Sequence, residues 1–318
     1  MHARIHAFTM IVVAAFAGIV PDRALAQEHA HEHGAEEHAH SHGGFPEFVD
    51  IFFTHHAYLE RKLHPRFDAL TAEDASQFSE SVELAWRFNH WLGGEVEAQA
   101  RQVRPDDDVV DDVSGIGDME IAPMVALLQD PERLLIVTAR SGFVLPTGDE
   151  DRGLGVDGWA WEPGLLVWKG FGAERRGALQ AELGYERAFL RAGEDEEELV
   201  YNLGLSWWLP SNFLPIVEIN GRERLGDAVA APHDHEEEHD HEQEAGHAAL
   251  APRADRALGL AHGGELIESD DRLLSGTVGF RYAFANGQQW GGGVQFPLFG
   301  DTESYEWRLV VGGIIHLQ

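Results

Sequence analysis

The chain has 318 residues with 55 acidic and 23 basic side chains, a formal net charge of −32, and no cysteine. So acidic a balance excludes nucleic acid as a partner, because phosphate contacts need clustered lysine and arginine. The lack of cysteine excludes disulfides and thiolate metal sites. The length is enough for one large domain.

The first residues have the pattern of a secretory signal peptide. Arg4 supplies the positive charge, residues 8–20 are apolar, and residues 24–26 (Ala-Leu-Ala) form a small-residue cleavage site. The apolar run is too short to cross a membrane as a helix. We therefore expect residues 1–26 to be removed on export.

The next segment, residues 27–44, repeats His, Glu, Ala and Gly without an apolar face. This composition is typical of disordered chain, and we expect a histidine-rich periplasmic tail. The remaining residues, 45–318, are predicted to form one membrane domain with a long external loop at 225–271 that is rich in histidine and acid.

Apolar and polar side chains alternate through most of this domain. Leu199, Tyr201, Leu203, Leu205 and Trp207, for example, alternate with mostly polar residues. A period of two with one apolar face is typical of a strand whose two faces meet different surroundings. About twelve such runs follow one another, and the gaps between them are alternately short and long. We place these strands at residues 48–63, 78–90, 92–103, 117–128, 134–145, 158–170, 176–187, 198–209, 213–224, 272–284, 289–299 and 305–317.

This pattern predicts an all-β fold, an antiparallel up-and-down transmembrane β-barrel in the bacterial outer membrane. An even strand count puts both termini in the periplasm, with tight turns on that side and longer loops outside. A closed sheet also satisfies every backbone amide in lipid. A soluble β-sandwich is the alternative, but aromatic residues near strand ends favour an interfacial girdle. These aromatics are Trp86, Trp159, Trp161, Trp207, Trp290 and Trp307.

The polar face of these strands is predicted to line the lumen. Two interpretations remain open: a hydrated pore with selective charge rings, or a narrow barrel filled by ion pairs. The predicted lumen residues are Glu60, Glu83, Arg87, Glu95, Glu97, Arg101, Glu120, Arg140, Glu162, Glu182, Glu186, Glu218, Arg222, Arg281 and Arg308.

No catalytic constellation stands out in the sequence. The nearest approach is Thr54 with His56 and Glu60, which are expected to share one face of a strand. A satisfied lumen histidine is the simpler interpretation, so we expect no enzymatic activity.

Eleven of the nineteen histidines fall in two runs, at residues 28–43 and 232–246 with its flank. Imidazole with neighbouring carboxylates suits zinc, copper, nickel or cobalt, and flexible chain can wrap around such an ion. A solubilising spacer or a pH-responsive loop is the alternative. No cofactor is required, but zinc or copper ions are expected on these residues. The candidate ligands are His29, His31, His33, His38, His40, His42, His233, His235, His239, His241 and His247.

Two short motifs carry a family resemblance. Residues 115–118 (Gly-Ile-Gly-Asp) open a strand after an acidic loop, and residues 145–149 (Leu-Pro-Thr-Gly-Asp) end the next strand. Together they resemble the outer-membrane β-barrel family labelled for the meta-pathway of phenol degradation, over roughly residues 78–317. The resemblance implies a transporter or channel. The chain departs from many such barrels because it ends His316-Leu317-Gln318 rather than on an aromatic residue, and assembly would then use an internal signal.

We therefore expect a monomeric outer-membrane channel or transporter linked to capture or passage of zinc or copper. Its partners would be outer-membrane lipid, the barrel-assembly machinery, and metal ions or small solutes. A passive channel for small hydrophobic or aromatic solutes, and a non-conducting metal-binding surface barrel, are the alternatives.

Overall fold

The computed structural model describes residues 49–72, 75–105, 112–172, 176–191, 195–225, 272–300 and 305–317. The predicted signal peptide, the histidine-rich tail and all but the first residue of the predicted 225–271 loop lie outside this part of the chain. Among the described residues, no helix is long and apolar enough to cross a membrane.

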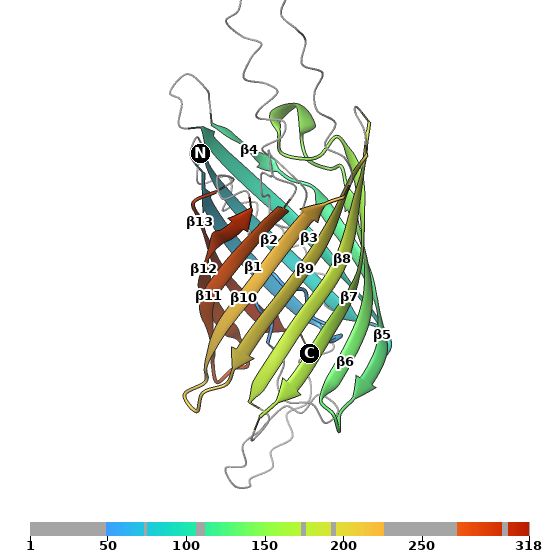
Figure 1. Ribbon diagram of the computed structural model, residues 1–318, viewed down its shortest axis with the longest axis vertical. Helices are drawn as coiled ribbons and strands as arrows, with labels where there is room; N and C mark the ends of the chain where they lie inside the picture. The colour runs from blue at the N-terminus through green and yellow to red at the C-terminus, as the bar shows by residue number, and fades with distance from the viewer. Residues whose placement is uncertain are drawn as a thin grey trace, which may run out of the picture.

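Antiparallel strands form nearly all of the described structure, with a short 3-10 turn, η2, at Glu150–Arg152. The strands run diagonally around a single barrel (Figure 1). They are β1 Lys62–Thr71, β2 Ala75–Arg87, β3 Leu92–Pro105, β4 Val113–Ile116, β5 Met119–Asp130, β6 Leu135–Leu145, β7 Gly158–Phe171, β8 Gly177–Leu190, β9 Glu196–Trp207, β10 Phe213–Arg224, β11 Arg272–Ala283, β12 Gln289–Gly300 and β13 Trp307–His316.

The sheet is closed on itself. β1 pairs with β13 from Lys62↔His316 to Thr71↔Trp307, and it pairs with β2 along its other edge. β4 and β5 share one position in the wall, because β5 pairs with the first part of β3 and β4 with a later part. The thirteen strands therefore fill twelve wall positions, which confirms the predicted twelve-stranded up-and-down barrel.

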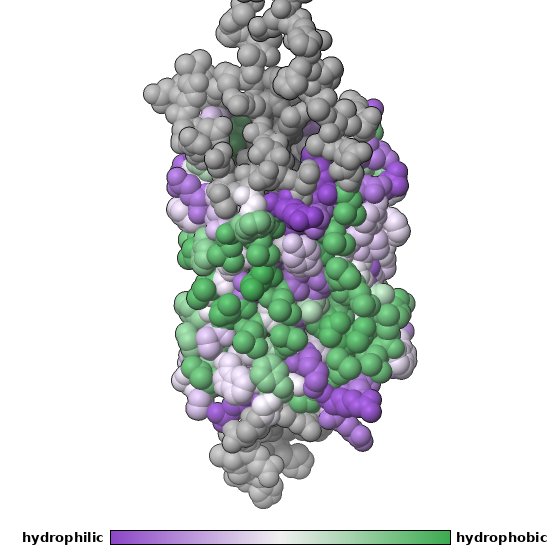
Figure 2. Space-filling view, viewed as in Figure 1, coloured by the Kyte–Doolittle hydropathy of each residue, from purple (hydrophilic) through white to green (hydrophobic). Residues whose placement is uncertain are grey.

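Alternation along each strand separates an outer apolar face from an inner polar face. In β10, Val217 and Ile219 are 49% and 44% exposed on the outside, whereas Glu218 between them is 1% exposed inside. On the face shown in Figure 2, apolar side chains make a broad band across the middle of the barrel, with polar residues toward both ends. This is the outer surface expected of a barrel that crosses a lipid bilayer.

The prediction for the first strand was wrong. Residues 49–61, expected to be in a strand, have no regular secondary structure, and the first strand is β1, most of which lies in the stretch 64–77 that was expected to be a loop. Pro65 and the charged residues Arg66 and Asp68 are unusual in a strand, although Leu63 and Phe67 lie on one face of β1 and Arg66 and Asp68 on the other. The connection after β1 is consequently the short stretch 72–74.

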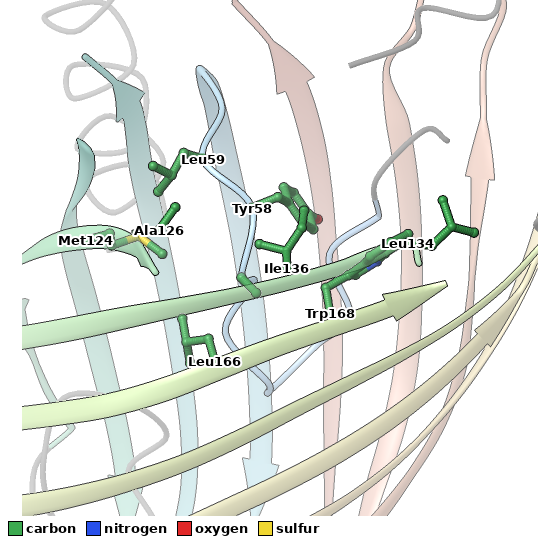
Figure 3. Close-up of a cluster of buried hydrophobic side chains, with 9 residues drawn as sticks. Tyr58, Leu59, Met124, Ala126, Leu134, Ile136, Leu166 and Trp168 are labelled. Carbon is green, nitrogen blue, oxygen red and sulfur yellow. The ribbon is translucent and has the colours of Figure 1, made fainter. Parts of the chain in front are cut away.

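Residues 49–61, which we call the inner segment, cross the inside of the barrel. At one end Ile51 and Phe52 pack against Leu214, Ile216 and Val310 on β10 and β13. At the other end the inner segment meets β5, β6 and β7 (Figure 3). There Ala57, Tyr58 and Leu59 form a buried cluster with Met124, Ala126, Leu134, Ile136, Leu166 and Trp168.

The cluster in Figure 3 predicts which tryptophan matters most for stability. Trp168 is 2% exposed and packs inside, whereas Trp161 on the same strand is 38% exposed on the outside. We expect Trp168→Ala to reduce the free energy of unfolding by about 3–5 kcal/mol, because it leaves a cavity between wall and inner segment. Urea unfolding followed by circular dichroism checks this. Trp161→Ala is the control, and equal losses in the two variants would contradict the packing argument.

Candidate functional site

The inside of the barrel is the candidate site, and its most prominent feature is how the wall holds the inner segment. Because this segment lacks regular structure, its backbone groups need partners from elsewhere. Glu218 on β10 accepts hydrogen bonds from the backbone N–H of Phe52 and from that of Phe53, the latter at 3.0 Å. Glu182 on β8 accepts from His55 twice, from its backbone N–H at 3.1 Å and from ring Nδ1 at 2.7 Å.

Cationic and neutral wall residues bind the carbonyl oxygens of the same segment. Arg281 Nε on β11 donates to the Asp50 carbonyl at 2.6 Å, and its Nη2 donates to the Ile51 carbonyl at 3.4 Å. Gln180 donates to the Val49 carbonyl at 2.8 Å, and the Thr138 hydroxyl donates to the Ala57 carbonyl. The inner segment is thus tied to β6, β8, β10 and β11.

Asp50 is the central acid of the inner segment. Its carboxylate accepts from the Lys62 ammonium group and from the Tyr58 hydroxyl. Lys62 Nζ also lies 3.0 Å from His56 Nδ1. Lys62 is fully buried, so its charge depends on these partners rather than on water.

Ion pairs occupy much of the remaining interior. Arg140 on β6 lies between Glu120, Glu95 at 3.4 Å and Glu162 at 3.8 Å. Farther around the wall, Arg222 on β10 contacts Glu198 at 3.3 Å and Glu186 at 3.6 Å. Arg308 on β13 contacts Asp68 on β1 at 3.0 Å. These contacts join neighbouring strands across the inner face.

The predicted lumen residues have different positions in the structure. Most are buried inside the barrel, while Arg87 is exposed at the end of β2 and Glu60 belongs to the inner segment rather than to a strand. Those buried on the strands are Glu95, Arg101, Glu120, Arg140, Glu182, Glu186, Glu218, Arg281 and Arg308, and those half-buried are Glu83, Glu97, Glu162 and Arg222.

Sequence reasoning missed the anchoring role of these residues. Glu182, Glu218 and Arg281 were predicted to line the lumen, either of a hydrated pore or of a barrel filled by ion pairs, and the structure shows that they bind the inner segment. The one available signal was the run from Phe52 to His56, in which apolar residues do not alternate with polar ones. All the predicted histidine ligands of the two runs lie outside the described residues.

A cavity of about 70 Å³ lies between the inner segment and one side of the wall. Phe53 and His55 line it from the inner segment, and Glu186, Asn202 and Arg222 line it from β8, β9 and β10. Such a volume holds a few water molecules rather than a solute of metabolite size. The lining includes charged side chains of both signs beside apolar groups such as Phe53 and Val200, and the small volume suits water and small ions.

The closed barrel with its apolar belt is the fold of outer-membrane porins. No family model matches the chain, and no curated protein matches it. Among solved structures, it is similar to the COG4313 outer membrane channel from Pseudomonas putida F1, with a TM-score of 0.57 and 11% identity over 85% of this chain and 100% of that one. A NanC porin structure has a TM-score of 0.49 and 9% identity over 80% of this chain and 100% of the porin. At these identities the likeness concerns the fold.

Two wall glycines provide a matched test of how the inner segment is seated. A Cβ added at Gly204 on β9 would overlap Ile51 Cδ1, whereas one at Gly184 on β8 would lie 3.7 Å from Val200 Cβ, in ordinary contact. We expect Gly204→Ala to destabilise the folded protein by about 1–3 kcal/mol and to make the inner segment more accessible to protease. Limited proteolysis and thermal unfolding measure both effects. Gly184→Ala should leave the stability and the protease resistance unchanged. The same behaviour in the two variants would contradict the close packing of Ile51 against Gly204.

Proposed function

We propose that the protein is a channel of the bacterial outer membrane for small solutes. The observation that carries the proposal is a closed barrel with an apolar outer belt around a charged interior. Lipid favours such an outer face, and charged inner walls suit hydrated solutes. The shared fold of the Pseudomonas putida channel supports the same proposal.

In this proposal the inner segment forms the constriction. It crosses the lumen and is held at both ends by buried apolar clusters and by wall carboxylates. The cavity of about 70 Å³ beside it is too small for most solutes. The protein should therefore conduct weakly while the inner segment is bound.

The proposal extends to divalent transition metals, zinc or copper first. Acidic loops would concentrate cations at the outer mouth. Histidines of the 225–271 loop would then bind them, and those of the 27–44 tail would receive them. The sequence alone supports this step, since these residues lie outside the described ranges.

Two other functions remain candidates. The dense ion pairing around Arg140 and Arg222 favours a barrel that binds metal at its surface without conducting. A passive channel for small hydrophobic or aromatic solutes is the other candidate, and the family resemblance in residues 115–118 and 145–149 favours it.

Conductance in a planar bilayer tests the constriction. We expect small steps from the wild-type protein and larger or longer openings from Glu218→Gln, because the neutral amide is a weaker acceptor for the backbone of the inner segment. Glu198→Gln is the matched control, since Glu198 is also buried but pairs with Arg222 instead.

The same recordings identify the alternatives. A silent membrane, with folding shown by heat-modified migration on gels, would contradict the channel and favour the non-conducting barrel. Equal steps from wild type and Glu218→Gln would contradict the inner segment as the constriction.

Metal accumulation in metal-starved cells tests the histidine loop. Deleting residues 232–246 should lower the zinc or copper content of the cells, because the proposed capture site is lost. Replacing His233, His235, His239, His241 and His247 by Asn should have the same effect while keeping the loop length. Unchanged accumulation in both variants, at equal protein levels, would exclude capture by this loop.

A further inference from the structure

We infer that His56, Glu83 and Glu95 form a divalent transition-metal site that fastens the inner segment to the barrel wall. His56 belongs to the inner segment, Glu83 to β2 and Glu95 to β3. The site is separate from the two histidine runs, and the inference does not depend on whether the barrel conducts.

The donor atoms already lie close together. One atom from each residue lies within 4.8 Å of the others, and His56 Nε2 is 3.1 Å from Glu95 Oε1. Zinc holds oxygen and nitrogen ligands at about 2.0–2.2 Å, which places neighbouring ligands roughly 3.3 Å apart. Small side-chain rotations would therefore bring all three atoms to one ion.

Each carboxylate of this site has a charged neighbour, Arg140 for Glu95 and Lys62 for Glu83, but one oxygen of each makes no hydrogen bond in the described structure. Glu83 Oε1 and Glu95 Oε1 are both buried and make no hydrogen bond among the described residues. In the β2–β3 register Ala85 faces Glu95, so Glu83 and Glu95 are diagonal neighbours on the inner face. Like charges at this spacing repel in a buried environment, and a cation between them offsets the repulsion.

The surroundings have a wider excess of negative charge. Lys62 lies within 4.0 Å of three carboxylates, and Arg140 lies within the same distance of three others. Lys62 is thus shared by Asp50, Glu60 and Glu83, and Arg140 is shared by Glu95, Glu120 and Glu162. A divalent ion would supply the positive charge that this part of the interior lacks.

Lys62 contacts His56 at ring nitrogen Nδ1, whereas the metal would bind the other ring nitrogen, Nε2. Its Nζ lies 3.0 Å from Nδ1, whereas Nε2 faces Glu95. With metal on Nε2, the ring proton would sit on Nδ1, and the Lys62 ammonium, which can only donate, would turn from Nδ1 toward its carboxylate partners Asp50 and Glu83.

The donor set indicates the class of metal. One imidazole and two carboxylates suit zinc or a neighbouring first-row ion better than calcium or copper(I). Three protein ligands leave a fourth position for water. The expected result of binding is a link between the inner segment and the β2–β3 hairpin.

Zinc binding to the purified full-length protein tests this site. We expect His56→Gln and Glu83→Gln each to hold one zinc ion fewer per chain than wild type after equilibrium dialysis. At zinc 100-fold above Kd, the wild-type melting temperature should rise by roughly 5 °C more than that of either variant. Every variant retains both histidine runs, so a difference in zinc content or in melting shift between variants comes from the interior site.

Two matched controls accompany these variants. His55→Gln removes the neighbouring histidine, which binds Glu182 instead, and Glu186→Gln removes a buried carboxylate that also has an unpaired oxygen. Both controls should bind zinc like the wild type. Equal zinc content and equal melting shifts in all five proteins would overturn the proposal. If His56→Gln fails to fold, the zinc content of Glu83→Gln is the deciding measurement. This variant should still fold, because Lys62 and His64, the cationic groups nearest Glu83, lie 3.8 Å or more away and lose little when its charge is removed.

Discussion

Closure of the sheet between β1 and β13 is the constraint on which the other features of this protein depend. A strand with an unpaired edge exposes backbone N–H and C=O groups, and lipid offers them no partner. Pairing from Lys62↔His316 to Thr71↔Trp307 removes that edge. Once the sheet is closed, each strand has one face toward the outside and one toward an enclosed space. The alternation of Val217, Glu218 and Ile219 then becomes a division between an apolar belt and a polar interior.

The enclosed space creates a second requirement, since charged groups removed from water need partners. The inner segment and the wall supply each other with these partners. Glu182, Glu218 and Arg281 bind backbone groups that would otherwise be unsatisfied, and the inner segment shields their charges from one another. Buried ion pairs add little net stability because of their desolvation cost, but they select one arrangement of the groups that bind them. The apolar clusters at both ends of the segment provide the favourable burial.

These features relate the interior to the proposed function. An inner segment held by a few wall residues forms a constriction whose opening depends on breaking identifiable contacts. The excess of carboxylates around Lys62 and Arg140 makes the same interior more favourable for cations than for anions. The acidic loops and the histidine runs of the sequence point to cations as well, although they belong to other parts of the chain.

The period-two pattern was sufficient to predict the barrel, its twelve positions and the approximate location of every strand after the first except the short β4, which lies in a predicted loop. It worked because adjacent side chains on a barrel strand meet lipid and lumen in turn, so the alternation is imposed locally. It failed at residues 48–63, where apolar side chains such as Ile51 and Phe52 face the interior of the barrel rather than lipid. It also failed at β1, where Pro65, Arg66 and Asp68 conceal the alternation.

Residue type and alternation were also enough to predict most of the charged side chains that lie on the inner face of the strands. They did not predict which residues these side chains contact. His56, Glu83 and Glu95 come from the inner segment and two strands, and no spacing in the sequence shows that their donor atoms meet. For the strands after β1, the sequence by itself determined most of which residues face outward and which face inward. Only the tertiary structure decided what each inward residue touches, because those contacts join distant segments such as Phe52 and Glu218, which meet only when the inner segment lies inside the closed barrel.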